Sequence, residues 1–448
     1  MEAPNDSIES FQGGIPFKSA LRYWLKLGFI SFGGPAGQIS IMHEELVVRK
    51  RWISEQRFLH ALNYCMILPG PEAQQLASYM GWLMHGTLGG IVAGTLFVLP
   101  SFILLIFLSW VYIRFGELAA IAGLFVGIKP AVTAIVAHAA FRIGKRVLKN
   151  WILFFIALAS LCAIVLFKVP FPCILFVAAL LGFVLGKLRP DTIMPVEQHT
   201  LADAEYTSNS ERDFFSRRLF VRRTGLRLWL TTTVGLLCWL LPMLFLHFVL
   251  GPGSVDTQMA WFFSKAALLT FGGAYAVLPY VYQGAVVHYT WLSPQQMIDG
   301  LGLGEATPGP LIMIVTFVGF VGGYQSTTDS ASMFILGLQT ATVATWFTFL
   351  PSFLFILIGA PLVEASRHKV TLSAPLTAVT AAVSGVIVNL FLFFAYHTFW
   401  PTGLQSKVDI VAVLLSIMSA VLLFRFKQSV IRVIVLNALI GLALQFIC

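Results

Sequence analysis

Charged side chains are scarce in this chain, which rules out an ordinary soluble fold. They make up 11% of the 448 residues, whereas a typical globular domain has about 25%. Hydrophobic residues make up 58%, the mean hydropathy is +0.83, and apolar runs of about 17–25 residues, long enough to cross a bilayer, recur along the chain. We therefore predict an all-α polytopic membrane protein.

Cysteine is also scarce, and the chain lacks the usual motifs of enzyme and metal sites. Its five cysteines have no paired spacing, so the sequence suggests neither a disulfide framework nor a zinc site. The nine histidines show no spacing typical of a metal or haem site, and no HExxH, GxSxG or phosphate-binding loop occurs. We therefore expect no cofactor and no metal, and an intramembrane enzyme has little support.

Positive charge is in excess, and its position decides what it means. A net charge of +9 is compatible with nucleic acid, anionic lipid or an anionic substrate as partner. Most of the Lys and Arg residues lie in a few loops between apolar segments, where such residues set the orientation of a chain in the membrane. We therefore expect the lipid bilayer as a partner and no nucleic acid.

The chain repeats its own motifs once, at a fixed spacing. Ser31-Phe32-Gly33-Gly34 recurs as Thr270-Phe271-Gly272-Gly273, Trp52-Ile53-Ser54 as Trp291-Leu292-Ser293, and Pro69-Gly70-Pro71 as Pro308-Gly309-Pro310. These pairs share one offset of 239 residues (270 − 31, 291 − 52 and 308 − 69). Leu99-Pro100-Ser101-Phe102 recurs as Leu350-Pro351-Ser352-Phe353, at an offset of 251 (350 − 99). Such self-similarity predicts two repeats of one structural unit.

The repeats and the segments between them define the expected domains. They are an N-terminal tail (1–16), a first repeat (17–188), a polar cytoplasmic linker (189–227), a connecting transmembrane helix (228–250) and a second repeat (258–447). Eight segments within the repeats are long enough to span the membrane: 86–113, 118–140, 151–167, 171–188, 332–358, 375–396, 408–424 and 429–446. With the connecting helix, this predicts nine spans.

Two segments in each repeat are interrupted rather than continuous. Segments 17–35 and 261–283 break at Gly-Gly, and segments 60–82 and 296–323 break at Pro-Gly-Pro. Glycine pairs and X-Pro steps end helices, and a broken backbone at membrane depth is tolerated only inside protein or beside a water-filled cavity. We therefore expect broken or re-entrant helices that line an interior site.

Charge predicts that the two repeats have opposite orientations. Arg49-Lys50-Arg51 lie between the interrupted segments of the first repeat, whereas the equivalent loop of the second repeat, 284–296, has no Lys or Arg. In the second repeat Arg367 and Lys369 instead follow the first spanning helix. The positive-inside rule then places the N-terminus in the cytoplasm and the C-terminus outside. The connecting helix supplies the extra crossing that inverts the second repeat.

Inverted repeats with broken helices at matching positions are typical of secondary transporters, whose substrate site lies at the repeat interface. At each break, free backbone N–H groups and the positive end of a half-helix favour an anion, and Ser31 and Thr270 offer hydroxyls beside them. Pro71 and Pro310 suit the first helical position after their breaks. The candidate substrate site is Ser31, Phe32, Gly33, Gly34, Pro69, Gly70, Pro71, Thr270, Phe271, Gly272, Gly273, Pro308, Gly309 and Pro310. Two other interpretations stay open: the breaks serve only close helix packing, and the hydroxyls bond their own helices.

Four ionisable residues in the membrane segments complete this site. Lys129 and Lys265, expected as a pair of buried lysines, would help to neutralise a dianion. Glu72 and Glu305 flank the Pro-Gly-Pro breaks, where a carboxylate repels an anion unless it is protonated. Because burial favours the protonated form, these carboxyls are candidates for coupling proton and anion movement. Glu72 fits a helix-capping carboxylate at least equally well.

The longest motifs resemble a known family. FGGPAGQISIMHEELVVRKRWIS (32–54), LPGPEAQQLASYMGW (68–82) and LFVLPSF (96–102), with TFGGAYAVLPYV (270–281) and GLGEATPGPLIM (302–313), are similar to the chromate ion transporter family. The resemblance covers both repeats and implies the long two-domain form of that family. It also implies a bacterial inner-membrane protein that exports chromate, coupled to the proton motive force as an antiporter.

The resemblance leaves the substrate and the mode of transport open. Chromate and sulfate are both tetrahedral dianions, so a general sulfate or oxyanion carrier is one alternative, and an anion channel of the same architecture is another. A membrane-embedded chromate reductase is a third alternative, for which the chain has no cofactor motif. The expected substrate is a chromate- or sulfate-like oxyanion, and a homodimer is left open.

Overall fold

The computed structural model describes residues 15–188, 224–329, 331–365, 373–401, 403 and 407–447. The predicted tail and linker lie almost wholly outside these residues, as do Arg367 and Lys369. Every regular element in the described part of the chain is a helix, so the all-α prediction is confirmed.

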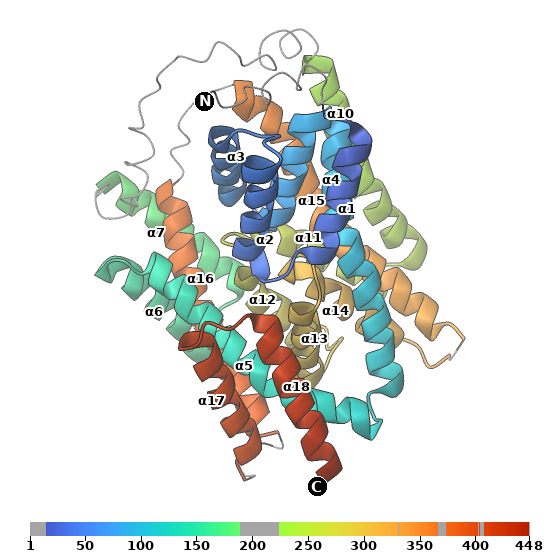
Figure 1. Cartoon of the computed structure of the whole chain (residues 1–448), viewed down its shortest axis with the longest axis vertical. Coiled ribbons are helices and arrows are strands. Elements are labelled where there is room, and N and C mark those ends of the chain that lie inside the picture. The colour runs from blue at the N-terminus through green and yellow to red at the C-terminus, as the bar shows by residue number, and fades with distance from the viewer. Residues whose placement is uncertain are drawn as a thin grey trace, which may run out of the picture.

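The helices fall into two series on either side of a connector (Figure 1). The first series is α1 (Phe17–Ile30), α2 (Gly34–His43), η2 (Glu44–Arg49), α3 (Glu55–Ile67), α4 (Glu72–Phe115), α5 (Ala119–Val147), α6 (Trp151–Phe167) and α7 (Phe171–Leu188). The connector is α10 (Thr224–Phe245) with η3 (Leu246–Leu250). The second series is α11 (Val255–Leu269), α12 (Ala274–Tyr282), η4 (Gln283–His288), α13 (Pro294–Ala306), η5 (Leu311–Met313), α14 (Ile314–Tyr324), α15 (Met333–Ala365), α16 (Ser373–Phe399), α17 (Ile410–Phe424) and α18 (Val430–Ile447).

Six helices are long and apolar enough to cross a membrane, so the chain is a multi-pass membrane protein. They are Glu72–Phe115, Ala119–Val147, Phe171–Leu188, Leu228–Leu250, Met333–Pro361 and Ala374–Phe399. The other three predicted spans are helical and apolar but shorter, at Trp151–Phe167, Ile410–Phe424 and Val430–Phe446. All nine predicted spans are therefore helices, and six of them reach full membrane-spanning length.

The long helix α4 is a tight hairpin rather than a single rod. Its backbone leaves helical geometry at His85 (φ −138°, ψ 23°) and Gly86 (φ 64°, ψ −155°). Beyond this point the chain turns back, and its two arms are in close contact. A Cβ on Gly90 would lie only 3.0 Å from the carbonyl oxygen of Ser78 and 3.1 Å from Cβ of Trp82. The segment after Pro-Gly-Pro thus folds back against the following span, as expected for a re-entrant element.

The two series share local irregularities at the same spacing as the sequence motifs. The π-helical turns at 44–49 and 283–288 are 239 residues apart (283 − 44), and so are Arg51 (φ 50°) and Thr290 (φ 52°), which are both left-handed. Ser54 and Ser293 cap α3 and α13, each accepting a hydrogen bond from the backbone N–H three residues on. A membrane-spanning helix needs neither a π-helical turn nor a left-handed residue, so these shared irregularities are not explained by membrane spanning alone.

Two helix bundles make up the molecule, and one of them exchanges helices between the series. Bundle A contains α1–α4 and α10–α15, and bundle B contains α5–α7 and α16–α18. Within bundle B, α5 packs against α17 and α18, whereas α16 packs against α6 and α7 (Figure 1). These contacts are close: a Cβ on Gly127 of α5 would collide with the Asn437 carbonyl of α18. Bundle A meets bundle B mainly where α12 touches α16 and α13 touches α5.

Candidate oxyanion site

The four predicted breaks meet in pairs, each formed by both series. The Gly70 N–H donates to the carbonyl of Thr270 at 2.7 Å, and the Gly309 N–H donates to the carbonyl of Ser31, also at 2.7 Å. The buried side chain of Gln38 adds a bond from Nε2 to the Gly309 carbonyl at 2.6 Å. We call residues 31–34 with 308–310 the first junction, and residues 69–71 with 270–273 the second junction. Each Pro-Gly-Pro break therefore joins the Gly-Gly break of the other series.

The sequence explains why the chain breaks at these points. Ser31 and Thr270 end α1 and α11, so their carbonyls have no partner in their own helix and accept from the facing glycine. Gly70 (φ 132°) and Gly309 (φ 106°) adopt backbone angles that side chains disfavour. A Cβ on Gly70 would collide with Oγ of Ser352. Close approach between the two series therefore requires glycine at the centre of each Pro-Gly-Pro.

The hydroxyls and the central glycine amides at the breaks are already bonded within the protein, as the second of the two open interpretations holds for the hydroxyls. The Ser31 hydroxyl donates to the Leu27 carbonyl, and the Thr270 hydroxyl donates to the Ala266 carbonyl, both at 2.6 Å. These hydroxyls satisfy their own helices, because a buried serine or threonine readily bonds the carbonyl four residues before it. The amides of Gly70 and Gly309 are likewise occupied, by the facing carbonyls. The remaining donors at the junctions are first-turn N–H groups of α2, α4 and α12, apart from the Ala276 N–H, which donates to the Gly273 carbonyl.

The remaining predicted residues lie at the junctions. Pro71 and Pro310 each stand immediately before the first helical residue, one position earlier than expected. Phe32 and Phe271 are half-buried beside the glycine pairs, while Pro69 and Pro308 precede the central glycines. Gly33, Gly34, Gly272 and Gly273 all have positive φ.

Each junction holds one of the two predicted carboxyls. Glu305 lines a small cavity of about 10 Å³ with Gly33, Gly34 and Gly309, and its Oε1 accepts a hydrogen bond from the hydroxyl of Tyr275. Since Tyr275 follows the glycine pair of the second junction, this bond connects the two junctions.

Glu72 is the first residue of α4 and lies at the second junction. A Cβ on Gly273 would be 3.8 Å from Glu72 Oε1. Its place in the first turn also fits the capping interpretation.

Bundle B contributes positive charge to both junctions. The charge of Arg142 acts on Glu305, and that of Arg146 acts on Glu72. These two arginines are one turn apart near the end of α5, and both are exposed. In the sequence they stand among the loop arginines and lysines that set orientation in the membrane, but their spacing of four residues places them on one face of α5.

Lys129 is not a free cation, because it is paired with Asp299, which was not among the predicted site residues. Its Nζ lies 3.5 Å from Oδ2 of Asp299, and that oxygen also accepts a hydrogen bond from the Tyr112 hydroxyl at 2.9 Å. The Asp299 side chain is only 4% exposed, and its Oδ1 has no partner. The pair joins α5 of bundle B to α13 of bundle A.

The expectation that Lys265 is buried is wrong. Its side chain is exposed, whereas its neighbours Phe262, Phe263 and Ala266 on α11 are buried. The residue therefore does not contribute a buried charge, and its position six residues before a glycine pair was a poor guide to its side-chain direction.

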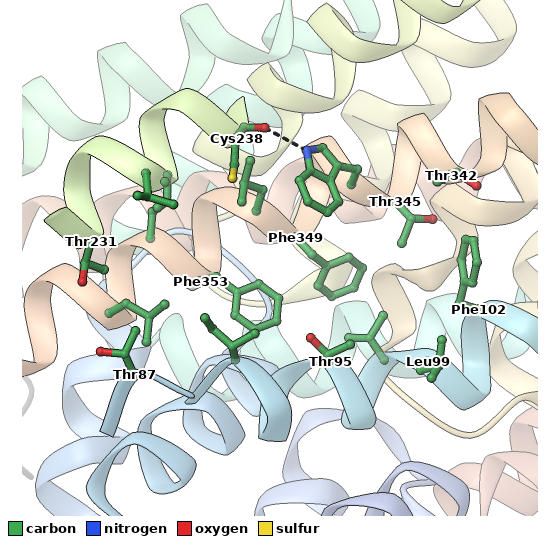
Figure 2. Close-up of a pocket in the computed structure, with 18 of the residues that line it drawn as sticks. Thr87, Thr95, Leu99, Phe102, Thr231, Cys238, Thr342, Thr345, Phe349 and Phe353 are labelled. Carbon is green, nitrogen blue, oxygen red and sulfur yellow. Dashed lines mark hydrogen bonds between the residues drawn. The ribbon is translucent and has the colours of Figure 1, made fainter. Parts of the chain in front are cut away.

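A larger cavity elsewhere is unsuited to an anion (Figure 2). It has a volume of about 640 Å³ and lies between α4, α10 and α15, where Thr95 and Leu99 face Phe349 and Phe353. Its walls are almost entirely apolar, and the hydroxyl of Thr345 donates to its own helix, at the Ala341 carbonyl. No lysine or arginine lines it. The polar junctions are therefore the candidate site.

A multi-pass membrane protein whose broken helices meet in polar junctions has the architecture of a membrane transporter. The chain belongs to the chromate transporter family, whose sequence pattern it matches over residues 19–183 and again over residues 257–442.

Curated relatives agree with this assignment. The chain is 30% identical over 426 residues to the chromate transport protein of Cupriavidus metallidurans, covering 95% of this chain and 92% of that protein. It is 32% identical over 447 residues to the chromate transport protein of Pseudomonas aeruginosa, covering 99% and 95%. A shorter relative, the uncharacterized transporter YwrB of Bacillus subtilis, is 30% identical over 146 residues, which are 32% of this chain and 74% of that protein. No solved structure matches the chain.

Proposed function

We propose that the chain is a secondary transporter that exports chromate across a bacterial inner membrane. The supporting observation is the pair of crossed junctions, where helix N-termini and one carboxyl meet at each, within reach of the charge of one exposed arginine. The names of the relatives supply chromate as the first substrate to test. We also propose that its N-terminus lies in the cytoplasm, its C-terminus in the periplasm and its two series in inverted orientations.

The junctions suit a tetrahedral oxyanion because their donors are of the kinds that anions prefer. The first-turn N–H groups of α2, α4 and α12 point out of helix ends that carry partial positive charge. Arg142 and Arg146 add full positive charge nearby. Gly33, Gly34, Gly272 and Gly273 leave the backbone open to an anion, because none of them carries a side chain.

The cavity at the first junction must widen to admit the anion. Its volume of about 10 Å³ is the space of one water molecule. Its walls come from both bundles, since Gly33 and Glu305 belong to bundle A whereas Val430 begins α18 of bundle B. Separation of the two bundles would open this cavity, so alternating access is proposed to occur by movement of bundle B against bundle A.

Export of a dianion draws on the membrane potential. With the cytoplasm negative, outward movement is favoured by about 2.3 kcal/mol per charge for each 100 mV, hence roughly 4.6 kcal/mol for two charges. A protonated Glu305 would remove the repulsion between its carboxylate and the anion, which couples the anion to protons. If the proton stays on Glu305 while the anion crosses, proton and anion leave together. An antiporter, in which proton and anion bind in turn, would instead show proton entry during anion exit, so the direction of proton movement tests which coupling operates.

The proposal is tested by flux into and out of proteoliposomes with a set membrane potential and pH gradient. We expect radiolabelled chromate to move against its own electrochemical gradient when a pH gradient is imposed and the potential is held at zero. Cells that express the protein should also hold less chromate than cells that lack it. Equal chromate in both kinds of cell would refute export, and flux that never runs against the electrochemical gradient of chromate would indicate an anion channel.

A general oxyanion carrier is the second candidate, because the donors at the junctions do not distinguish one tetrahedral dianion from another. Backbone N–H groups and arginines bind sulfate as readily as chromate, because both are tetrahedral dianions. Competition by sulfate at concentrations equal to chromate would support the general carrier. Failure of a large excess of sulfate to compete would support a chromate-selective site.

A further inference from the structure

Two buried serine hydroxyls stand out from all others in the described part of the chain. Among its buried serine and threonine residues, only Ser101 and Ser352 have a hydroxyl without a hydrogen-bond partner. They are 0% and 1% exposed. A buried hydroxyl without a partner is unfavourable in the folded protein, so each one calls for an explanation.

Neighbouring residues on the same helices show that a partner was available. On α4, the Ser109 hydroxyl donates to the Leu105 carbonyl at 2.6 Å. On α15, the Thr348 hydroxyl donates to the Ala344 carbonyl at 2.7 Å, one turn before Ser352. This bond to the carbonyl four residues back is the usual arrangement for a buried hydroxyl in a helix. Ser101 and Ser352 depart from it, although each lies well inside its helix.

The two serines also occupy equivalent positions in the recurring Leu-Pro-Ser-Phe motif and contact the junctions in a reciprocal way. Ser101 belongs to the first series and lies at the first junction, where a Cβ on Gly309 would be 3.1 Å from its Oγ. Ser352 belongs to the second series and lies at the second junction, where a Cβ on Gly70 would collide with its Oγ. Each Pro-Gly-Pro glycine is thus held between a carbonyl and a free hydroxyl of the other series.

We infer that the Ser101 and Ser352 hydroxyls are ligands of the transported tetrahedral oxyanion, one at each junction. The inference rests on the proposed function. An oxyanion has only acceptor oxygens, and a hydroxyl that is unpaired in the empty protein can donate to it without breaking an existing bond. Because a hydroxyl is uncharged, it can bind the anion without forming an ion pair with the Glu305 carboxylate. Because the Tyr275–Glu305 bond connects the junctions, both hydroxyls act on the same anion pathway.

The test compares four variants of the full-length protein in proteoliposomes. Ser101→Ala and Ser352→Ala remove the free hydroxyls. Ser109→Ala and Thr348→Val are matched controls, because each removes a buried hydroxyl that bonds its own helix. We expect each serine variant at a junction to raise the chromate or sulfate concentration for half-maximal transport roughly 10-fold, with the controls within about 2-fold of wild type. Ser101→Cys and Ser352→Cys, which keep a weak donor of similar size, should restore part of the loss.

A binding measurement without transport separates ligation from structure. Sulfate should raise the thermal unfolding temperature of the wild-type protein in detergent, because a ligand that binds the folded state stabilises it. Ser101→Ala and Ser352→Ala should lose much of this rise while unfolding no earlier than wild type in the absence of sulfate, since they remove an unsatisfied group.

The outcomes distinguish this inference from the proposed function. If wild type transports and is stabilised by either anion, but the two serine variants match the controls, the hydroxyls are not ligands. If wild type neither transports chromate or sulfate nor is stabilised by them, the proposed function fails, and the inference fails with it.

Discussion

At the scale of single residues, Glu305 is the carboxyl whose surroundings best fit a coupling role. It lines the cavity of the first junction and accepts a hydrogen bond from Tyr275, whereas Glu72 stands in the first turn of α4, where a carboxylate also serves as a cap. Only the neutral form of Glu305 leaves the cavity free of negative charge. Acidification should therefore strengthen anion binding as Glu305 takes up its proton.

The substitution Glu305→Gln imitates the protonated carboxyl permanently. We expect anion affinity in this variant to stay high at alkaline pH and to lose most of its pH dependence, whereas Glu72→Gln changes the pH profile less. The measurement is the half-saturating chromate concentration between pH 6 and pH 9 in proteoliposomes. An unchanged profile in Glu305→Gln would remove this residue from the coupling proposal.

The Lys129–Asp299 pair leads to an asymmetric prediction about stability. Asp299 is 4% exposed and Lys129 is 30% exposed, so an unpaired carboxylate is harder to hydrate here than an unpaired lysine. Lys129→Met should lower the free energy of unfolding by roughly 3 kcal/mol, and Asp299→Asn should lower it by less. The double variant should recover much of the loss, as followed by thermal unfolding in detergent. Equal destabilisation by both single variants would contradict the asymmetry.

Residue-level chemistry was only partly predictable from sequence. The candidate glycines, prolines and carboxyls do come together at the junctions. They could be identified from the sequence because helix breakers act on the local backbone. The free hydroxyls at Ser101 and Ser352 were not predicted, although their motif was seen to recur, because an unpaired hydroxyl is visible only once its neighbours are placed. Asp299 was missed although it lies in the apolar segment 296–323, and only the structure brings its distant partner Lys129 beside it.

At the scale of elements, the junctions depend on glycine for space as well as for backbone angle. Gly251 offers a matched comparison, since it has a φ of 83° but no atom within 4 Å of where a Cβ would stand. Gly251→Ala should cost about 1 kcal/mol through backbone strain alone and should leave transport unchanged. Gly70→Ala adds a collision with Ser352 and should also abolish most transport.

The measurement for this pair is the transport rate per unit of folded protein, together with the unfolding temperature. Similar transport by the two alanine variants would show that the close approach at the second junction is dispensable.

The breaks themselves were predictable from Gly-Gly and Pro-Gly-Pro. Their crossed pairing was not, because it depends on backbone contacts between residues about 200 positions or more apart, such as Gly70 and Thr270.

At the scale of the whole molecule, orientation is the prediction with the clearest test. Gln56 and Gln295 are 239 residues apart (295 − 56) and follow the caps of α3 and α13. In Figure 1, α3 lies toward one end of the molecule and α13 toward the other. In a background without the five native cysteines, Gln56→Cys and Gln295→Cys should react with an impermeant maleimide from opposite sides of the membrane. Labelling from the same side would overturn the inversion.

The membrane class and all nine apolar spans followed from composition and segment length, and the structure places each span in a helix. The exchange of α5 and α16 between the two series could not be foreseen, because packing partners in an apolar environment are chosen by small-residue contacts such as Gly127 with Asn437. That the two series are inverted repeats stays a prediction, supported by the shared offset of 239 residues.

The exchange in bundle B has a consequence for biogenesis. During synthesis α5 leaves the ribosome long before α17 and α18 exist, so it must wait in the bilayer without its final neighbours, and α6 and α7 must wait for α16. Neither half can complete this bundle alone. A chain cut within the linker at 189–223 and expressed as two polypeptides should therefore reassemble into one complex, while either fragment by itself should be degraded by membrane quality control.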